Sequence, residues 1–529
     1  MNLHGKSFVG DGFGSEGGET FHAVSPLDSA RLEPAFHAAD LAEVNRVMEL
    51  AEAAFGSYRE TTGKERAVFL ERIADEILAL GDALIERAHL ETGLPAARLT
   101  GERLRTVNQL KMFAAMAVDG SWVDARVDTA VPDRKPVPKP DLRRMLIPMG
   151  PVIVFGSSNF PLAYSVAGGD TASALATGNP VVVKAHSAHP GTSELVAGAI
   201  SRAVKACGLP PGVFSMLHGS GKVIGTALVR HPFARAVGFT GSRAAGRALF
   251  DAAASRPDPI PVFAEMSSLN PIFILPGALK ERAAQIAEGL KGSVTLGVGQ
   301  FCTKPGLVFG LHSDAWKQFQ RTLASAFEGV APTTMLHAGI HESYHEGLTR
   351  ATTAKGVRVL ARSRDPADPT KTQGEAVIAD VDAAEFVRKP ALAEEVFGPF
   401  SLLISAGTMA ELEEIARGLE GQLTATVHGT PADLEAAGPL LRLLERKAGR
   451  LILNGFPTGV EVCPSMNHGG PYPATTDVRF TSVGTAALQR FVRPICYQDF
   501  PAAQLPPALQ EGNPLGIWRT VNGTLTREQ

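Results

Sequence analysis

Pro180-Val-Val-Val183, which ends at Lys184, is the stretch that decides the fold of this chain. A short apolar run of this kind is typical of a strand buried on both faces of a parallel sheet. The segment from Thr192 to Ala206 has apolar residues at helical spacing and is closed by Gly208, which predicts an amphipathic helix. Val213-Phe-Ser-Met-Leu217 is the next apolar run. This alternation of strand and helix predicts a doubly wound parallel sheet.

The same rhythm continues on both sides of this stretch. Val152–Phe155 and Ala236–Phe239 are further apolar runs, and Pro261–Ala264 ends at Glu265. A second set of strands and helices then runs to about residue 480. The predicted class is α/β, with a Rossmann-like sheet domain, a second α/β domain and a terminal segment. The predicted boundaries are 1–265 for a cofactor-binding domain, 266–480 for a catalytic thiol domain and 481–529 for a tail.

The remaining segments predict local features around these two domains. Residues 1–25 are rich in glycine and predict an irregular arm, and residues 93–116 predict a pair of helices. Prolines recur through 131–141, which predicts an extended connector or an edge hairpin that contributes to oligomerisation. The proline-rich tail 481–529 is expected to pack on a partner subunit, in a homodimer or homotetramer.

Composition excludes several classes of function. The 529 residues are 44% hydrophobic and 20% charged, with a net charge of −3, so neither nucleic acid nor an anionic membrane is an expected partner. The uncharged run 145–169 contains three prolines, which disfavours a membrane span. We expect no secretory signal, because the first residues lack a basic segment leading into an apolar core. Four widely spaced cysteines form no disulfide framework or CxxC site, which favours the reducing cytoplasm.

Polar residues follow the ends of four predicted strands, where open α/β sheets bind ligands. Ser242, after Gly241, opens a helix whose free N–H groups can hold a phosphate. Glu265 follows an apolar run, which is expected to raise its pKa towards the range of a general base. A Walker A loop and a GxGxxG motif are absent from the relevant stretches. The four sites are Asn159, Lys184, Gly241-Ser242 and Glu265.

Cys302 lies in a glycine-rich segment that carries no charge from Gly292 to Thr303. A nucleophilic thiol needs a field that stabilises the thiolate, a base within reach and a backbone that substrate can approach. Gly297 and Gly299 satisfy the last requirement. A lone cysteine is more often a small buried hydrophobe, so the nucleophile interpretation depends on the other candidate residues.

Taken together, these residues form a recognisable series: Asn159-Phe-Pro161, Lys184, Phe239-Thr-Gly-Ser242, Glu265, Gly299-Gln-Phe-Cys-Thr303 and Glu394-Glu-Val-Phe-Gly-Pro399. Over nearly its whole length the chain resembles the aldehyde dehydrogenase superfamily. The resemblance implies that Cys302 attacks the aldehyde, Asn159 completes an oxyanion hole, and Glu265 activates the water that hydrolyses a thioester. It further implies NAD(P) contacts at Lys184, Ser242, Glu395 and Phe397, and no metal.

Two departures from the family pattern matter. NAD-restricted relatives usually have an acidic residue three positions after the lysine, where this chain has Ser187. Serine does not repel a 2′-phosphate, so NADP is the expected cofactor, with NAD also accepted; His186 and His189 would assist only if protonated. The second departure is Glu265-Met-Ser-Ser-Leu-Asn270, where many relatives have glycines and a lysine after the glutamate.

The C-terminal third is similar to a narrower group, the bacterial 2,5-dioxovalerate (α-ketoglutarate semialdehyde) dehydrogenases and related NADP-accepting enzymes. This similarity implies oxidation of 2,5-dioxopentanoate to 2-oxoglutarate in sugar acid catabolism, with Arg103 or Arg105 as candidate anchors for the far carboxylate. Alternatives are a broad-specificity or fatty aldehyde dehydrogenase, a CoA-acylating enzyme, which Glu265 disfavours, and a cysteine hydrolase or inactive binding protein. The motifs that carry the similarity are Asn454–Val462, His468–Ala474 and Arg493–Phe500.

Overall fold

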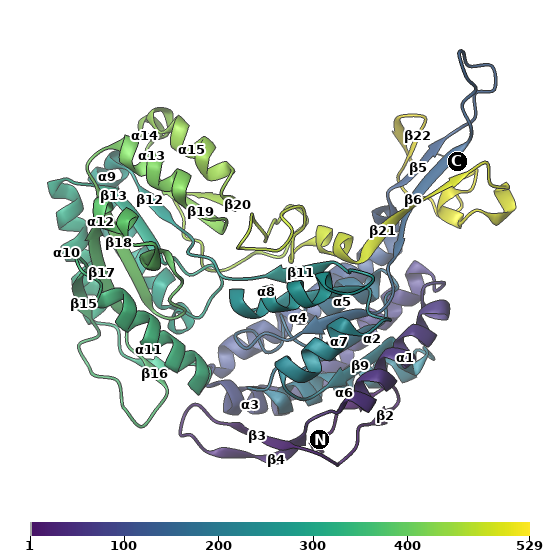
Figure 1. The fold of residues 1–529 in the computed structure, drawn as a ribbon, viewed down its shortest axis with the longest axis horizontal. Helices are drawn as coiled ribbons and strands as arrows, with labels where there is room; N and C mark the ends of the chain where they lie inside the picture. Colours follow the sequence, from purple (N-terminus) through teal and green to yellow (C-terminus); the bar gives the residue numbers. More distant parts are fainter. Residues whose placement is uncertain (1–2, 529) are drawn as a thin grey trace.

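The computed structural model describes residues 3–528, which form two α/β layers and a projecting third sheet (Figure 1). The first sheet has the strand order β11-β10-β7-β8-β9-β1-β2. The five strands from β11 to β9 are parallel. The antiparallel strands β1 (Phe8–Val9) and β2 (Gly12–Phe13) extend the sheet beyond β9. Their bounds are β7 Val152–Phe155, β8 Val181–Lys184, β9 Phe214–Leu217, β10 Ala236–Thr240 and β11 Val262–Glu265.

Helices cover both faces of this sheet, as the apolar runs predict. In β8, Val181 and Val183 face the core beneath α2, α4 and α6, while Val182 faces the core beneath α1, α7 and α8. Alternate residues of one short strand are therefore buried on opposite sides. The bounds of these helices are α1 Leu41–Tyr58, α2 Gly63–Ala79, α4 Ala96–Asp119, α6 Pro190–Ala206, α7 Thr226–Arg230 and α8 Arg243–Ala254.

Two local predictions were wrong. Residues 1–25 are not an irregular arm, because β1 (Phe8–Val9) and β2 (Gly12–Phe13) extend the first sheet and β3 (Thr20–Val24) pairs with β4 (Arg31–His37). The segment 93–116 is not a helix pair. Residues 96–116 belong to the single helix α4, which is followed by Gly120 in a left-handed conformation (φ 71°).

The second layer is built on a sheet of order β15-β17-β18-β13-β12-β19-β20. Only β15 at the edge is antiparallel to its neighbour among the described strands. The predicted α/β class with two α/β units is confirmed. The bounds are β12 Ile272–Ile274, β13 Leu307–Leu311, β15 Arg358–Arg362, β17 Val377–Asp382, β18 Phe400–Ala406, β19 Gln422–His428 and β20 Ala448–Leu453.

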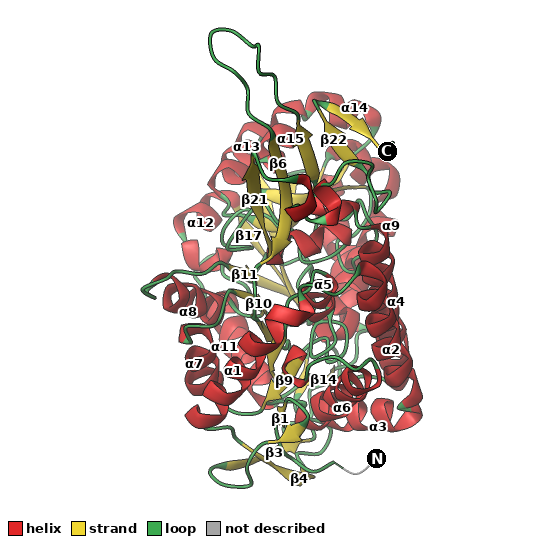
Figure 2. Cartoon of the chain, turned by 90° about the vertical axis from the view of Figure 1, so that its right-hand side faces the viewer, coloured by secondary structure: helices red, strands yellow, loops and turns green. Residues whose placement is uncertain are grey.

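The third sheet, of order β21-β6-β5-β22-β23, stands away from both layers (Figures 1 and 2). The proline-rich segment is the hairpin loop between β5 (Ala125–Asp128) and β6 (Leu142–Pro148), closed by a bridge between Val131 and Lys139. The tail adds β21 (Val492–Gln498), β22 (Arg519–Val521) and β23 (Thr524–Thr526). A small core joins the tail to the hairpin. Among residues 3–528, no helix is both long and apolar enough to cross a membrane.

Candidate active site

The Cys302 loop is held in an unusual backbone conformation. It follows α9 (Pro276–Thr295), and Gly297, Val298 and Gly299 take successive φ values of 57°, 58° and 65°. Valine is strained in this left-handed region. A side chain at Gly299 would place its Cβ 2.3 Å from the carbonyl group of Gly398, so this glycine permits close contact between the two loops. The thiol loop therefore lies directly against the segment that contains Glu395 and Phe397.

The unusual segment after Glu265 supports this loop. Asn270 has a left-handed backbone (φ 47°), and its Nδ2 donates to the carbonyl oxygens of Cys302 (2.9 Å) and Lys304 (3.0 Å). The Ser268 hydroxyl donates to Oδ1 of Asn270 at 2.9 Å and to Oε1 of Gln422 at 3.1 Å. Ser268, which stands where many relatives have glycine, and Asn270 thus form a buried network with Gln422 that positions Cys302.

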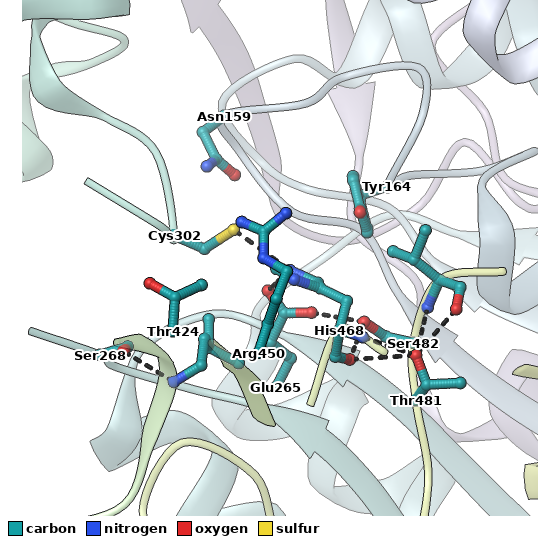
Figure 3. Close-up of polar contacts among 12 residues, drawn as sticks. Asn159, Tyr164, Glu265, Ser268, Cys302, Thr424, Arg450, His468, Thr481 and Ser482 are labelled. Carbon is teal, nitrogen blue, oxygen red and sulfur yellow. Dashed lines mark hydrogen bonds and ion pairs between the residues drawn. The ribbon is translucent and has the colours of Figure 1, made fainter. Parts of the chain in front are cut away.

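Glu265, His468 and Cys302 form the centre of the site (Figure 3). His468 Nε2 lies 2.9 Å from Glu265 Oε1 and 3.4 Å from the Cys302 sulfur. The Ser482 hydroxyl donates to the other carboxylate oxygen at 2.6 Å. Three potential ligand atoms within 4.8 Å of one another would also suit a thiophilic cation such as Zn²⁺. Without such a cation, the cluster can accept a proton from the thiol and stabilise the thiolate.

The expected rise in the pKa of Glu265 is wrong in direction. Burial alone would raise this pKa, but the charge and hydrogen bond of His468, together with Ser482, outweigh burial and lower it. Burial and the neighbouring carboxylate raise the pKa of the Cys302 thiol well above its usual value. Near neutral pH the site therefore combines an ionised base with a protonated thiol. Because a carboxylate only accepts, His468 Nε2 carries a hydrogen in this state.

Asn159 lies on the other side of Cys302 (Figure 3). Its Nδ2 donates to the backbone carbonyl of Gln300 at 3.1 Å. The backbone carbonyl of Asn159 accepts from the guanidinium of Arg98 at 2.8 Å. One amide hydrogen is thus used to orient the side chain, and the amide has a second hydrogen to donate. The structure brings Asn159, Cys302 and Glu265 to the same place, as predicted from strand ends and motif order.

A pocket opens at Cys302. Arg105 lines it, whereas Arg103 points away and donates to the carbonyl of Gly81 at 2.6 Å. Arg450, on β20, also lies beside Cys302 (Figure 3). The other lining residues are Phe160, Tyr164, Phe301, Thr303, Gly459 and Val460.

The candidate cofactor residues lie along the carboxyl edge of the first sheet. Lys184 ends β8 with a buried side chain, and within residues 3–528 its ammonium group makes no hydrogen bond or ion pair. Burial lowers its pKa to about 8. Ser187 is exposed nearby. Burial lowers the pKa of His186 and His189, so both are neutral near pH 7 and the idea that they assist phosphate binding as cations loses its support.

The remaining candidates surround the start of α8 and the Gly398 loop. Ser242 caps α8, and its hydroxyl accepts from the N–H of Ala245 at 3.3 Å. Gly241 precedes it and donates to the Glu265 carbonyl at 3.0 Å. Burial raises the pKa of Glu395, which contacts the segment just after Glu265, and Phe397 is half-buried. Lys184, the exposed start of α8 and the carboxylate of Glu395 are groups that suit the binding of a dinucleotide.

Three residues of this site escaped prediction from sequence: His468, Asn270 and Arg450. His468 and Arg450 reach Cys302 from positions more than a hundred residues further along the chain. His468 begins one of the C-terminal motifs noted above, which was the only available signal. Nothing local marks a histidine in a loop as the partner of a distant carboxylate.

Known proteins match this chain in sequence and in fold. Residues 13–485 match the model of the aldehyde dehydrogenase family. The chain is 51% identical over 524 residues to alpha-ketoglutaric semialdehyde dehydrogenase 2 of Azospirillum brasilense, and 46% identical to the Acinetobacter baylyi alpha-ketoglutaric semialdehyde dehydrogenase, with 99% of each chain covered. A betaine aldehyde dehydrogenase from Staphylococcus aureus has the same fold, with a TM-score of 0.80, 20% identity, and 95% and 99% coverage. The chain belongs to the aldehyde dehydrogenase family and is an NAD(P)-dependent oxidoreductase acting on aldehydes.

Proposed function

We propose that this enzyme oxidises 2,5-dioxopentanoate, the semialdehyde of 2-oxoglutarate, to 2-oxoglutarate. The observation that carries the chemistry is the Glu265–His468–Cys302 cluster, whose cysteine lines a pocket. The two relatives named for this semialdehyde, each matched along almost the whole chain, support the substrate. The test is reduction of NADP, followed at 340 nm, with 2,5-dioxopentanoate and with pentanal. Equal kcat/KM for the two aldehydes would rule out the substrate assignment.

In this proposal, a named residue of the site acts in each step of the reaction. Cys302, deprotonated by Glu265 and stabilised as thiolate by the His468 N–H, attacks the aldehyde carbon to give a thiohemiacetal. The Asn159 amide and the Cys302 backbone N–H stabilise its oxyanion. NAD(P), held by Lys184, Ser242, Glu395 and Phe397, would supply the hydride acceptor that converts this adduct into a thioester on Cys302. Glu265 releases the thiol proton to solvent and is ionised again at neutral pH. It then accepts a proton from the water that attacks the thioester, and Cys302 leaves as the thiolate.

Two alternative activities fit the site less well. A CoA-acylating enzyme has no use for a buried water-activating base, whereas Glu265 is held ionised and hydrogen-bonded by Ser482. A fatty aldehyde would place its apolar chain beside the charged guanidinium of Arg105, which lines the pocket. Burying alkyl chain against a cation is unfavourable.

NADP is the preferred cofactor in this proposal, through Lys184, Ser187, Ser242, Glu395 and Phe397. Ser187 is exposed beside Lys184 and places no negative charge near a 2′-phosphate. We expect Ser187→Glu to shift the ratio of kcat/KM for NADP to that for NAD towards NAD, by about 5- to 150-fold, because like charges then meet. Ser187→Ala is the matched control and should change the ratio little. A wild-type preference of tenfold or more for NAD would contradict this interpretation.

The affinity for NADP should also depend on pH through Lys184. Burial lowers the pKa of this ammonium group to about 8, so in the free enzyme it is charged below pH 8 and neutral above. The attraction for cofactor phosphate and ribose is therefore expected below that pH and lost as the pH rises through it. Titration of protein fluorescence with NADP between pH 6.5 and 9.5 should show weaker binding at the alkaline end. Lys184→Met should remove this pH dependence. An affinity of the wild type for NADP that does not change with pH would contradict the prediction.

We also propose a role for each domain and an oligomeric assembly. Residues 1–265 bind the cofactor, 266–480 carry the thiol, and 481–529 belong to an oligomerisation element with the 131–141 hairpin. The support is the projecting third sheet and the edge strand β20, whose Leu451 and Leu453 are exposed (Figure 1). A homodimer or homotetramer in the cytoplasm follows, and light scattering after size exclusion tests the assembly.

A further inference from the structure

Two arginines face Cys302 from opposite layers of the molecule, and neither has an acidic partner. Arg105 comes from α4, and Arg450 comes from β20. Neither guanidinium forms an ion pair with a carboxylate of residues 3–528. Each also has a buried Nε without a hydrogen-bond partner. A guanidinium with an enclosed, unpartnered N–H group and no ion pair can take an anionic ligand.

The surroundings hold both groups near the reacting sulfur. Arg105 donates to the Tyr164 hydroxyl at 3.2 Å and lies over the rings of Tyr164 and Phe160, with its carbon Cζ 5.5 and 5.8 Å from the two centroids. Arg450 donates to the carbonyl of Pro457 at 2.8 Å. Its electrostatic neighbours include Cys302 and Tyr164. Stacking and backbone contacts thus hold the guanidinium groups of Arg105 and Arg450 in position without a ligand.

We infer that Arg105 and Arg450 together bind the 2-oxo acid end of the substrate, with Cys302 at its aldehyde end. This inference rests on the proposed function and names the residues that select its substrate class. A 2-oxo carboxylate presents two carboxylate oxygens and a ketone oxygen, all hydrogen-bond acceptors. Two guanidinium groups supply planar sets of donors that match such a group better than one ammonium would. The chain of 2,5-dioxopentanoate is short enough for both ends to lie in one small pocket.

A purely structural role is the competing explanation for Arg450. Its Nη2 also approaches the carbonyl of Gly459, which lines the pocket, so Arg450 fastens the loop that forms one wall. Loss of that role would impair every aldehyde equally. A substrate-binding role affects only the carboxylated aldehyde, so the two explanations are separated by comparing substrates within one variant.

The experiment measures kcat/KM for 2,5-dioxopentanoate and for pentanal in wild type and in Arg105→Gln, Arg450→Gln and Arg450→Lys. Arg103→Gln is the matched control, because Arg103 lies on the same helix and contacts Gly81 instead of the pocket. The second readout is inhibition of pentanal oxidation by 2-oxoglutarate, which reports binding of the acid end without its oxidation.

We expect each Arg→Gln variant to lower the ratio of the two kcat/KM values by at least about 30-fold, mainly through KM for the acid. The inhibition constant for 2-oxoglutarate should rise by a similar factor. Arg450→Lys should recover part of the preference, and Arg103→Gln should match wild type. If wild type prefers 2,5-dioxopentanoate but the glutamine variants keep that preference, the inference is wrong. A wild type without any preference would instead overturn the proposed substrate.

Discussion

Replacement of Cys302 by alanine is expected to lower aldehyde turnover by at least about 10³-fold, because no other group can form the covalent adduct. Cys302 is only half-buried, and its side chain serves no core, so the fold should persist. The measurement is NADPH formation at saturating aldehyde, together with the melting temperature and NADP binding. Both of the latter should stay close to the wild-type values.

The other cysteines provide the control for this prediction. Cys207, Cys463 and Cys496 lie outside the cluster formed by Glu265 and His468. Alanine at each of the three should leave most of the activity. Turnover above a few per cent of wild type in Cys302→Ala would exclude this residue as the nucleophile.

Glu265→Gln and His468→Ala are expected to fail at different steps. In Glu265→Gln no carboxylate requires a hydrogen on His468 Nε2, so the tautomer whose Nε2 can accept the thiol proton becomes available. Cys302 can then still react, and rapid mixing should show a burst of NADPH followed by steady turnover reduced by about 10²- to 10⁴-fold. In His468→Ala the thiolate loses its donor at 3.4 Å, and the burst itself should slow by about 10²-fold or more.

The outcomes that contradict these assignments are distinct. Normal steady turnover in Glu265→Gln would exclude Glu265 as the deacylating base. A burst of unchanged rate in His468→Ala would exclude a role for His468 in thiol activation. Ser482→Ala serves as a milder variant, since it removes one hydrogen bond to Glu265 and keeps the contact with His468.

Much of the first layer could be predicted from the chain because its strands are buried on both faces. The run Val152–Phe155 coincides with β7. Strand β8, Val181–Lys184, matches the predicted strand that ends at Lys184. Parallel strands align their carboxyl ends, so Asn159, Lys184 and Glu265 were recognisable as residues of one edge. The role of Cys302 required the family pattern, since a single cysteine is ambiguous.

Features that depend on contacts between distant segments were not predictable. The apolar run before Glu265 correctly indicated burial and wrongly indicated a raised pKa, because His468, 203 residues away, reverses the shift. Val298 gives no sign of a left-handed backbone, which the packing of Gly299 on Gly398 imposes. The N-terminal strands were missed because residues of two-strand pairs at a sheet edge lack a periodic pattern long enough to detect.

The long separation between Glu265 and Ser482 also bears on how the protein is made. The carboxylate acquires this partner only after a further 217 residues have been added, which takes about 10 to 40 seconds at ordinary translation rates. Throughout that interval β11 lacks its bridge to Thr475, and β6 lacks β21. A nascent chain on the ribosome therefore carries Cys302 and Glu265 before His468 and Ser482 have been added. The cluster of Cys302, Glu265 and His468 is thus complete only after the C-terminal segment has been synthesised.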